Sequence, residues 1–275
     1  MDIKISNIEN YTHLFLNKNP NLLGIEWVDP IFVVMARAYQ NKENIVLNID
    51  NSYFGKMLTS NFERFKTFSP VENIKNRIDV EKVANHLVSI MLKNFTHIEK
   101  DDIKDLRDYI QYMFTEIMNN VADHSHSRVG GYAMAQYYPQ LKKIQFAVSD
   151  CGVGFLKNIK LKFPDINSED DAIKKALKKG VTATKATMYG SQKNAGYGLY
   201  AMQEILKLTD GNFCIISNDT MVRSKNGEIE SKRLSTKWNG TVIAFEFMES
   251  NINYDMDYFK KNYLWNDLDD EEDEF

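Results

Sequence analysis

The chain has 275 residues, enough for one large domain or two small ones, and it is 43% hydrophobic and 26% charged, as soluble globular proteins are. Its formal net charge of −4 gives no global basic field, so it carries no strong nucleic-acid signal. No apolar run is long enough to span a membrane, the N-terminus has no signal-peptide core, and two cysteines predict neither a disulfide framework nor a metal cluster, so we expect a cytoplasmic protein.

The first zone, residues 1–98, shows strand and helix signals in alternation. Asp29 and Pro30 predict a helix start, because aspartate suits the N-cap and proline suits the first helical position. The apolar run that follows is long enough for a buried helix. We expect a small α/β region with strands over residues 24–28 and 44–49 and helices over residues 31–39 and 53–62.

The second zone, residues 99–250, opens with the clearest helical pattern of the chain. Apolar residues from Ile103 to Val121 recur at three- and four-residue steps, which predicts one apolar stripe on a helix. The run Ser168–Asp171 resembles a capping box before another helix. Further helices are expected over residues 172–179 and 199–208, and strands over 132–138, 144–148, 213–217 and 241–247.

This order of elements predicts an α+β fold, a sandwich in which helices cover one face of a mixed sheet. The last zone, residues 251–275, is expected to be an acidic, solvated tail.

The first polar motif lies on the long predicted helix. Glu116, Asn120 and Asp123 share one face, because residues four and seven apart nearly eclipse on a helix. The amide oxygen of asparagine is a hard neutral ligand suited to Mg²⁺, and a carboxylate beside it can act as a general base. The alternative interpretation is an amphipathic helix with polar residues at its rim.

The second motif, Asp150-Cys151-Gly152-Val153-Gly154, ends a predicted strand. Glycines one residue apart let the backbone approach a ligand closely or take a positive φ. The Asp150 carboxylate can accept a hydrogen bond from an amino group, such as that of adenine. An ordinary tight turn after a strand is the alternative.

The third motif, Gly196-Tyr197-Gly198-Leu199, immediately precedes a predicted helix. Free N–H groups and the positive dipole end at a helix N-terminus suit a phosphate. It is neither a Walker A loop nor a Rossmann fingerprint. The fourth motif, Gly240-Thr241, opens the last predicted strand and says little alone.

The four motifs follow one another as Glu-x3-Asn on a helix, Asp-x-Gly-x-Gly after a strand, Gly-x-Gly-Leu before a helix and Gly-Thr before a strand. This order resembles the GHKL (Bergerat-fold) ATPase superfamily, which includes DNA gyrase, the ninety-kilodalton heat-shock chaperone, histidine kinases and mismatch-repair ATPases. The resemblance covers roughly residues 100–249. It implies a Bergerat-fold α/β sandwich that binds ATP and Mg²⁺.

The resemblance also implies a role for each matching residue. Asp150 would read the adenine amino group, and Thr241 would support the adenine end of the pocket. Asn120 would bind Mg²⁺, and Glu116 would be the general base. The other implied ligand-binding positions are two glycines beside the base, the phosphate-side glycine box and an aspartate after the asparagine: Gly152, Gly154, Gly196, Gly198, Leu199 and Asp123.

The stretch from Phe155 to Ala195 corresponds to the mobile ATP lid of that superfamily. Within it, residues 180–182 and 189–193 are expected to close over the phosphates. Lys193 is a candidate phosphate contact, with a solvated loop lysine as the alternative.

Two departures from the superfamily narrow the interpretation. None of the five histidines has the context of a phospho-accepting histidine, and there is no long transducer region like that of gyrase-type enzymes. The chain looks like a compact, stand-alone member. Residues 26–30 and the elements around them faintly resemble a STAS-like domain, the fold of anti-sigma-factor antagonists. The alternative is an extension that packs on the ATPase sheet.

Three functions are open at this point. The first is a regulatory ATPase that hydrolyses ATP with Mg²⁺ and switches a protein partner through its lid. The second is a serine protein kinase of the anti-sigma-factor type, in which Glu116 activates a hydroxyl instead of water. The third is a binding module in which nucleotide only stabilises a conformation. GHKL relatives often dimerise in their working cycle, so a homodimer is also expected as a possibility.

Overall fold

The computed structural model describes residues 1–16, 18, 20–50, 52–59, 67–94, 100–181, 198–225 and 227–248. Its elements confirm the α+β class that the sequence predicts. In chain order they are β1 (Asp2–Ile3), the 3₁₀ helices η1 (Ile8–Asn10) and η2 (Thr12–Leu16), β2 (Trp27–Val28), α1 (Pro30–Glu43), α2 (Tyr53–Thr59), β3 (Glu72–Ile74), α3 (Arg77–Leu92), α4 (Lys100–His124), β4 (Gly131–Tyr138), β5 (Lys143–Asp150), α5 (Gly154–Ile159), α6 (Glu169–Ala176), α7 (Gly198–Leu208), β6 (Asn212–Lys225) and β7 (Glu228–Met248).

Five strands form the main sheet, in the order β3-β4-β5-β7-β6. All four of the pairings described within it are antiparallel, so the expectation of a mixed sheet is wrong. Strands β6 and β7 form a hairpin that pairs residues as far apart as Asn212 and Glu246. A short turn can join two such strands because they are antiparallel. A separate parallel pair joins β1 to β2.

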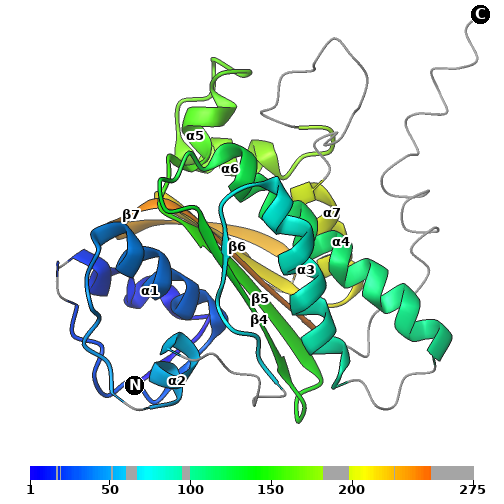
Figure 1. The fold of residues 1–275 in the computed structure, drawn as a ribbon. Coiled ribbons are helices and arrows are strands. Elements are labelled where there is room, and N and C mark those ends of the chain that lie inside the picture. The colour runs from blue at the N-terminus through cyan, green and yellow to red at the C-terminus, as the bar shows by residue number, and fades with distance from the viewer. Residues whose placement is uncertain are drawn as a thin grey trace, which may run out of the picture.

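Helices α3, α4 and α7 cover one face of the sheet (Figure 1), and α5 and α6 lie at one end of the same layer. The predicted helix over 103–121 is confirmed within α4. Its apolar stripe packs on the sheet, where Phe114 stacks on Phe146 at 4.3 Å and Phe146 on Phe245 at 5.1 Å between ring centroids. The Asn76 side chain caps α3 by accepting from two backbone N–H groups.

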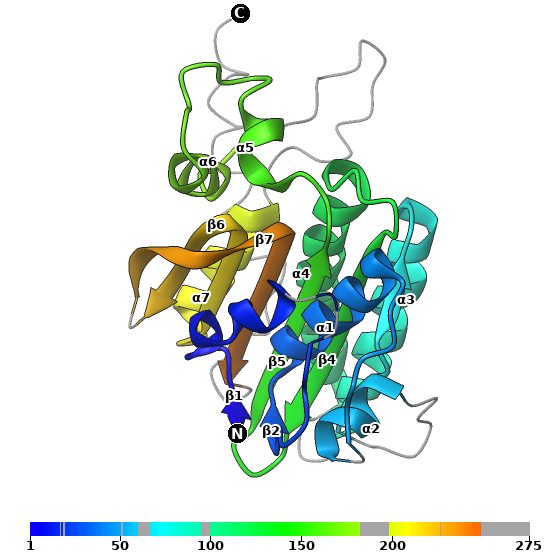
Figure 2. The same ribbon diagram turned by 90° about the vertical axis from the view of Figure 1, so that its left-hand side faces the viewer.

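The N-terminal region covers the opposite face of the sheet (Figure 2), whereas α4, α6 and α7, the described helices of the predicted sandwich that contribute to its core, pack on one face. Helix α1 is buried along most of its length, and it packs against β4 and β5. One buried cluster combines Phe32 of α1 with Met134, Ala147 and Ala244 of the sheet. The N-terminal region and the sheet therefore share this core.

The predicted strand over 44–49 is not a strand. Helix α1 continues to Glu43 and is followed by Asn44 in the left-handed conformation, with φ 52°. Beyond it, Val46 is 88% exposed, and the segment makes only an isolated bridge between Asn48 and Asn21. A β-branched apolar run looked like a strand, but no neighbouring strand of the described chain pairs with it.

Other boundaries differ more modestly. The strand predicted over 24–28 is reduced to β2, and the helix predicted over 53–62 is described as α2, to Thr59. Strand β3 and helix α3 come from residues assigned to the N-terminal region, yet they belong to the sheet and to its helical layer. The acidic tail, 251–275, lies outside the described residues. None of the described helices is long and apolar enough to cross a membrane.

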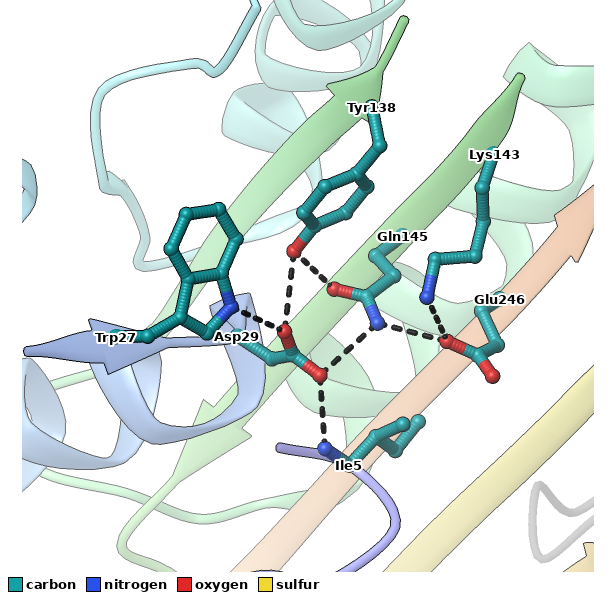
Figure 3. A network of polar contacts seen from close by, with 7 residues as sticks. All are labelled: Ile5, Trp27, Asp29, Tyr138, Lys143, Gln145 and Glu246. Carbon is teal, nitrogen blue, oxygen red and sulfur yellow. Dashed lines mark hydrogen bonds and ion pairs between the residues drawn. The ribbon is translucent and has the colours of Figure 1, made fainter. Parts of the chain in front are cut away.

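A polar network anchors α1 to the sheet (Figure 3). Asp29 stands at the N-cap position of α1, but its side chain accepts no capping hydrogen bond. Its carboxylate instead accepts from the Ile5 backbone N–H at 2.9 Å, the Gln145 amide at 3.0 Å and the Tyr138 hydroxyl at 3.1 Å. Because Gln145 also donates to Glu246 at 2.7 Å, the network links α1 to strands β4, β5 and β7.

Candidate functional site

A cavity opens where the C-terminal half of α4, the turn after β5, the start of α7 and strand β7 meet. It holds about 780 Å³ of space, counting its mouth to solvent. Residues from each of the predicted motifs line it, namely Glu116, Asn120, Asp150, Gly154, Gly198, Leu199 and Thr241. These segments are separated by as much as half of the chain, so the fold rather than local sequence brings them together.

Asp150 ends β5 at the base of the cavity and is only 1% exposed. Its Oδ1 accepts hydrogen bonds from the backbone N–H groups of Gly152 at 2.7 Å and Thr241 at 3.3 Å. Its backbone carbonyl accepts from the Trp238 indole at 3.0 Å. Burial raises the pKa of this carboxyl to about 7, although both backbone donors favour the charged form. Within the described residues, both hydrogen bonds to the carboxylate go to Oδ1, so Oδ2 is left for a ligand.

Asn120 and Glu116 lie one turn apart on α4, and both face the cavity. The Nδ2 atom of Asn120 is buried and has no hydrogen-bond partner in the described part of the chain. A buried donor without a partner is costly, so this amide is able to donate to a polar group that enters the cavity. Burial raises the pKa of Glu116, Arg77 opposes that shift and Asp123 adds to it.

Gly198 begins α7 directly beside Glu116. A Cβ atom at this position would lie 2.9 Å from Glu116 Oε2 and 3.1 Å from Glu116 Cβ, tighter than ordinary contacts. Glycine therefore allows the N-terminus of α7 to approach the carboxylate. The first N–H groups of a helix have no intrahelical partners, and here they lie at the cavity. Gly196 and Lys193 lie outside the described residues.

Gly152 and Gly154 allow the turn after β5 to pack closely against neighbouring segments. A Cβ atom on Gly152 would overlap the carbonyl oxygen of Ser125, which also accepts from the Val153 N–H at 3.0 Å. Gly154 has φ 78°, and a Cβ there would overlap Asn218. The sequence suggests that these glycines let backbone approach a ligand, but in the structure they let the turn approach α4 and β6.

Asp123 forms a two-point ion pair with Arg77 of α3, at 2.6 and 2.5 Å. It does not belong to the residues that line the cavity, although the sequence places it in the binding set. Because Arg77 and Asp123 are 46 residues apart, this partnership has no signal in the sequence. The pair lies close enough to Glu116 for both charges to act on its pKa.

Sequence reasoning missed part of the cavity wall. The residues that were not singled out are Asn119, Val121, His124, Ser125 and Ile243, together with Phe155, Asn158, Ile159 and Ala176 of the stretch assigned to the lid. Val181 belongs to the run 180–182 that was expected at the phosphates. Asn119 lies three residues after Glu116 on α4, so helical spacing was an available signal for it. Asn158 donates to the carbonyl of His124 at 2.7 Å, which ties α5 to the end of α4.

The buried Glu169 holds α5, which forms part of the cavity wall, against β6. Its carboxylate accepts from the N–H groups of Phe155 and Leu156, each at 3.0 Å, and from Asn218 at 2.8 Å. The predicted cap at Ser168 is confirmed, since its hydroxyl accepts from the Asp171 N–H at 3.0 Å. The capping pattern in the sequence predicts only that Glu169 lies near the start of a helix. It does not predict the contacts of Glu169 with α5 and β6.

Comparison with known proteins leaves the family open. No family model matches the chain, and no curated protein matches it. The function is therefore inferred from the cavity itself. Among the described residues, no three or more histidine, cysteine, aspartate or glutamate side chains form a group that could hold a metal ion.

Proposed function

We propose that the chain is a stand-alone GHKL-type, Bergerat-fold ATP-binding protein, and that it acts as a Mg²⁺-dependent regulatory ATPase. The observation that supports this most is convergence: four motifs, recognised separately in the sequence, contribute residues to one cavity. A chance set of rim residues and tight turns has no reason to meet in this way. The antiparallel sheet with α3, α4 and α7 on one face is compatible with the proposal.

The adenine base is assigned to the end of the cavity at Asp150 and Thr241. The ionised Asp150 carboxylate accepts hydrogen bonds, and its Oδ2 can accept one from the exocyclic amino group of adenine. Ile243 and Val121 add apolar surface that suits a flat aromatic base. This end of the site therefore selects a base that carries an amino group.

The phosphates are assigned to the opposite end, between Asn120 and the N-terminus of α7 at Gly198. Helix N–H groups and the helix dipole favour anionic groups there. The Asn120 Nδ2 atom, which has no partner among the described residues, fits a ligand of this kind, because the nitrogen can donate to a phosphate while the amide oxygen ligates Mg²⁺. Bound Mg²⁺ would neutralise charge on the phosphates, and a single protein ligand suffices for an ion that keeps waters and phosphate oxygens.

Glu116 is assigned as the general base for an attacking water. A base works best when its pKa lies near the working pH, and burial moves the pKa of Glu116 upward from its ordinary acidic value. Its position against Gly198 supports a place for the carboxylate at the proposed phosphate end of the cavity. Phe155 and Val181, both in the stretch 155–195 that the resemblance assigns to the lid, line the cavity. Nucleotide-dependent closure of that lid would be the signal to a protein partner.

The proposal is tested by measuring ATP binding and phosphate release separately. Glu116→Gln should retain binding and lose about a hundredfold or more of the hydrolysis rate, the usual contribution of a general base. Glu81→Gln makes the same type of change at an exposed position of α3, and this variant should bind and hydrolyse ATP as the unaltered protein does. Wild-type turnover in Glu116→Gln would remove Glu116 from the chemistry. Tight binding without turnover in the unaltered protein would reduce the proposal to a nucleotide-binding module.

A further inference from the structure

A second hollow lies on the other face of the sheet, between α1, the β3 segment and the loop that joins α4 to β4. It holds about 850 Å³ of open space. Tyr132 of β4 lies in its wall and is largely buried. The wall combines residues from three separate segments, namely Arg37, Asn41, Val71, Asn73, Lys75, Arg128, Val129 and Tyr132.

Three of these residues, Arg37, Lys75 and Arg128, are positively charged, and no carboxylate of the described chain lines the hollow. The ion pairs of the described residues include none of the three. Asp79 is close in sequence, but its carboxylate accepts from the backbone N–H groups of Lys75 and Asn76 in the cap of α3. The hollow therefore has an uncompensated positive charge in a protein whose net charge is negative.

Arg37 is the residue that makes this more than a set of solvated surface charges. Its side chain is partly buried, and burial lowers the pKa of its guanidinium. It donates to the Gln40 side chain at 3.1 Å and to the Leu58 carbonyl. These neutral acceptors use only part of the five donors of a guanidinium, and they supply no countercharge. A partly desolvated cation gains most from an anion that binds beside it.

The loop that carries Arg128 is held in place by Asn73 of β3. The Asn73 amide donates to the carbonyls of Val129 at 3.2 Å and Gly131 at 3.0 Å. Gly130 takes φ 73°, and a Cβ there would overlap the Ile74 carbonyl, so the loop lies close against β3. The rim of the hollow is thus fixed before any ligand arrives, which reduces the entropy lost on binding.

We propose that this hollow is a second binding site, specific for a small molecule that carries a phosphate or diphosphate group. Three cations from three segments match a ligand with two or more negative charges, and Arg37 provides donors for bidentate contact with phosphate oxygens. The site is separate from the nucleotide cavity: Tyr132 belongs to the core on the α1 face, whereas the cavity opens on the α4 face. The proposal stands whether or not ATP binds in the cavity.

The test is a calorimetric titration of inorganic pyrophosphate into the full chain in Mg²⁺-free buffer. The variant is the double change Lys75→Gln with Arg128→Gln. Both side chains are exposed, so folding should be retained, and an unchanged melting temperature checks this. The matched control is Lys82→Gln with Lys237→Gln, two exposed lysines elsewhere, which alters the net charge equally. A third titration uses Asn120→Ala to remove any pyrophosphate held at the nucleotide cavity.

We expect the double variant to bind pyrophosphate at least about tenfold more weakly than the control, because two charge-assisted contacts are lost. Asn120→Ala should leave pyrophosphate binding at the hollow unchanged. ATP affinity should be the same in the double variant and the control. Higher salt should weaken the interaction, as it does for exposed charges. Equal affinity in the double variant and the control, or no pyrophosphate binding outside the nucleotide cavity, would overturn the proposal.

Discussion

Two buried polar side chains, Asp29 on the α1 face of the sheet and Asn120 on the α4 face, differ in whether the protein satisfies them. On the α1 face, the Asp29 carboxylate is surrounded by donors from Ile5, Tyr138 and Gln145, and it needs nothing from outside the protein. On the α4 face, the Asn120 amide nitrogen is buried without a partner among the described residues. A satisfied buried group holds a structure together, whereas an unsatisfied donor beside a cavity can bind an acceptor that enters it. The following predictions test that distinction.

The largest effect is expected at Asp150, whose folded pKa is about 7 instead of 3.8. Between these values the folded protein keeps a proton that the unfolded chain has lost, so stability falls as pH rises from about 4 to 7. The full difference corresponds to about 4 kcal/mol. Asp150→Asn cannot ionise and should lack this loss.

The measurement is urea unfolding of both proteins at several pH values. The difference in free energy of unfolding between Asp150→Asn and the unaltered protein should grow in favour of the variant up to pH 7 and then stay constant. Parallel pH profiles would show that the buried carboxyl has an ordinary pKa in solution.

The next effect is expected at Asp29, where the α1 face should behave as structure alone. Asp29→Ala removes an acceptor shared by four donors, those of Ile5, Trp27, Tyr138 and Gln145, and should lower the free energy of unfolding by about 3 kcal/mol. Asp29→Asn keeps one acceptor oxygen and should lose less. ATP affinity, measured by calorimetry on the folded variants, should not change. A loss of affinity with unchanged stability would mean that the network serves the site.

A smaller effect links Asp150 to the ligand. If the ionised carboxylate accepts from the adenine amino group, ATP affinity should fall about tenfold for each pH unit below 7, because the proton must first leave. The matched ligand is purine riboside triphosphate, which has the same phosphates and no amino group. Its affinity should depend less on pH. Identical pH profiles for the two ligands would place the base elsewhere.

The smallest effect is expected at the ion pair of Arg77 with Asp123. The Arg77 side chain is 45% exposed, so Arg77→Gln should lower stability by less than about 1 kcal/mol. Because Arg77 lowers the pKa of Glu116, the same variant should move the pH profile of ATP hydrolysis toward higher pH. A stability loss of several kcal/mol would instead make the pair part of the folding core.

The sequence predicted those parts of the molecule whose signal is local. The stripe from Ile103 to Val121 lies within α4, and the strands expected over 132–138 and 144–148 lie within β4 and β5. Strand β3 was missed because it is three residues long, and it exists only through pairing such as that of Glu72 with Ala133. Pairing partners far apart in the chain leave no periodic pattern.

The candidate site shows the same limit. Asp150 and Asn120 could be selected from residue type and spacing, and both line the cavity. The tasks of Gly152 and Glu169 could not be predicted, because their partners, Ser125 and Asn218 among them, come from other segments. The hollow on the α1 face gave no motif at all, since its three cations come from separate elements.

The central claim is tested most directly by calorimetric titration of ATP into the full chain, with and without Mg²⁺. The unaltered protein should bind ATP, and Mg²⁺ should tighten binding. Asn120→Ala should bind about ten- to a hundredfold more weakly with Mg²⁺, because a contact to a charged ligand is lost, whereas Asn85→Ala, an exposed asparagine of α3, should bind normally. No ATP binding by the unaltered protein, or equal binding by the two variants, would contradict the account.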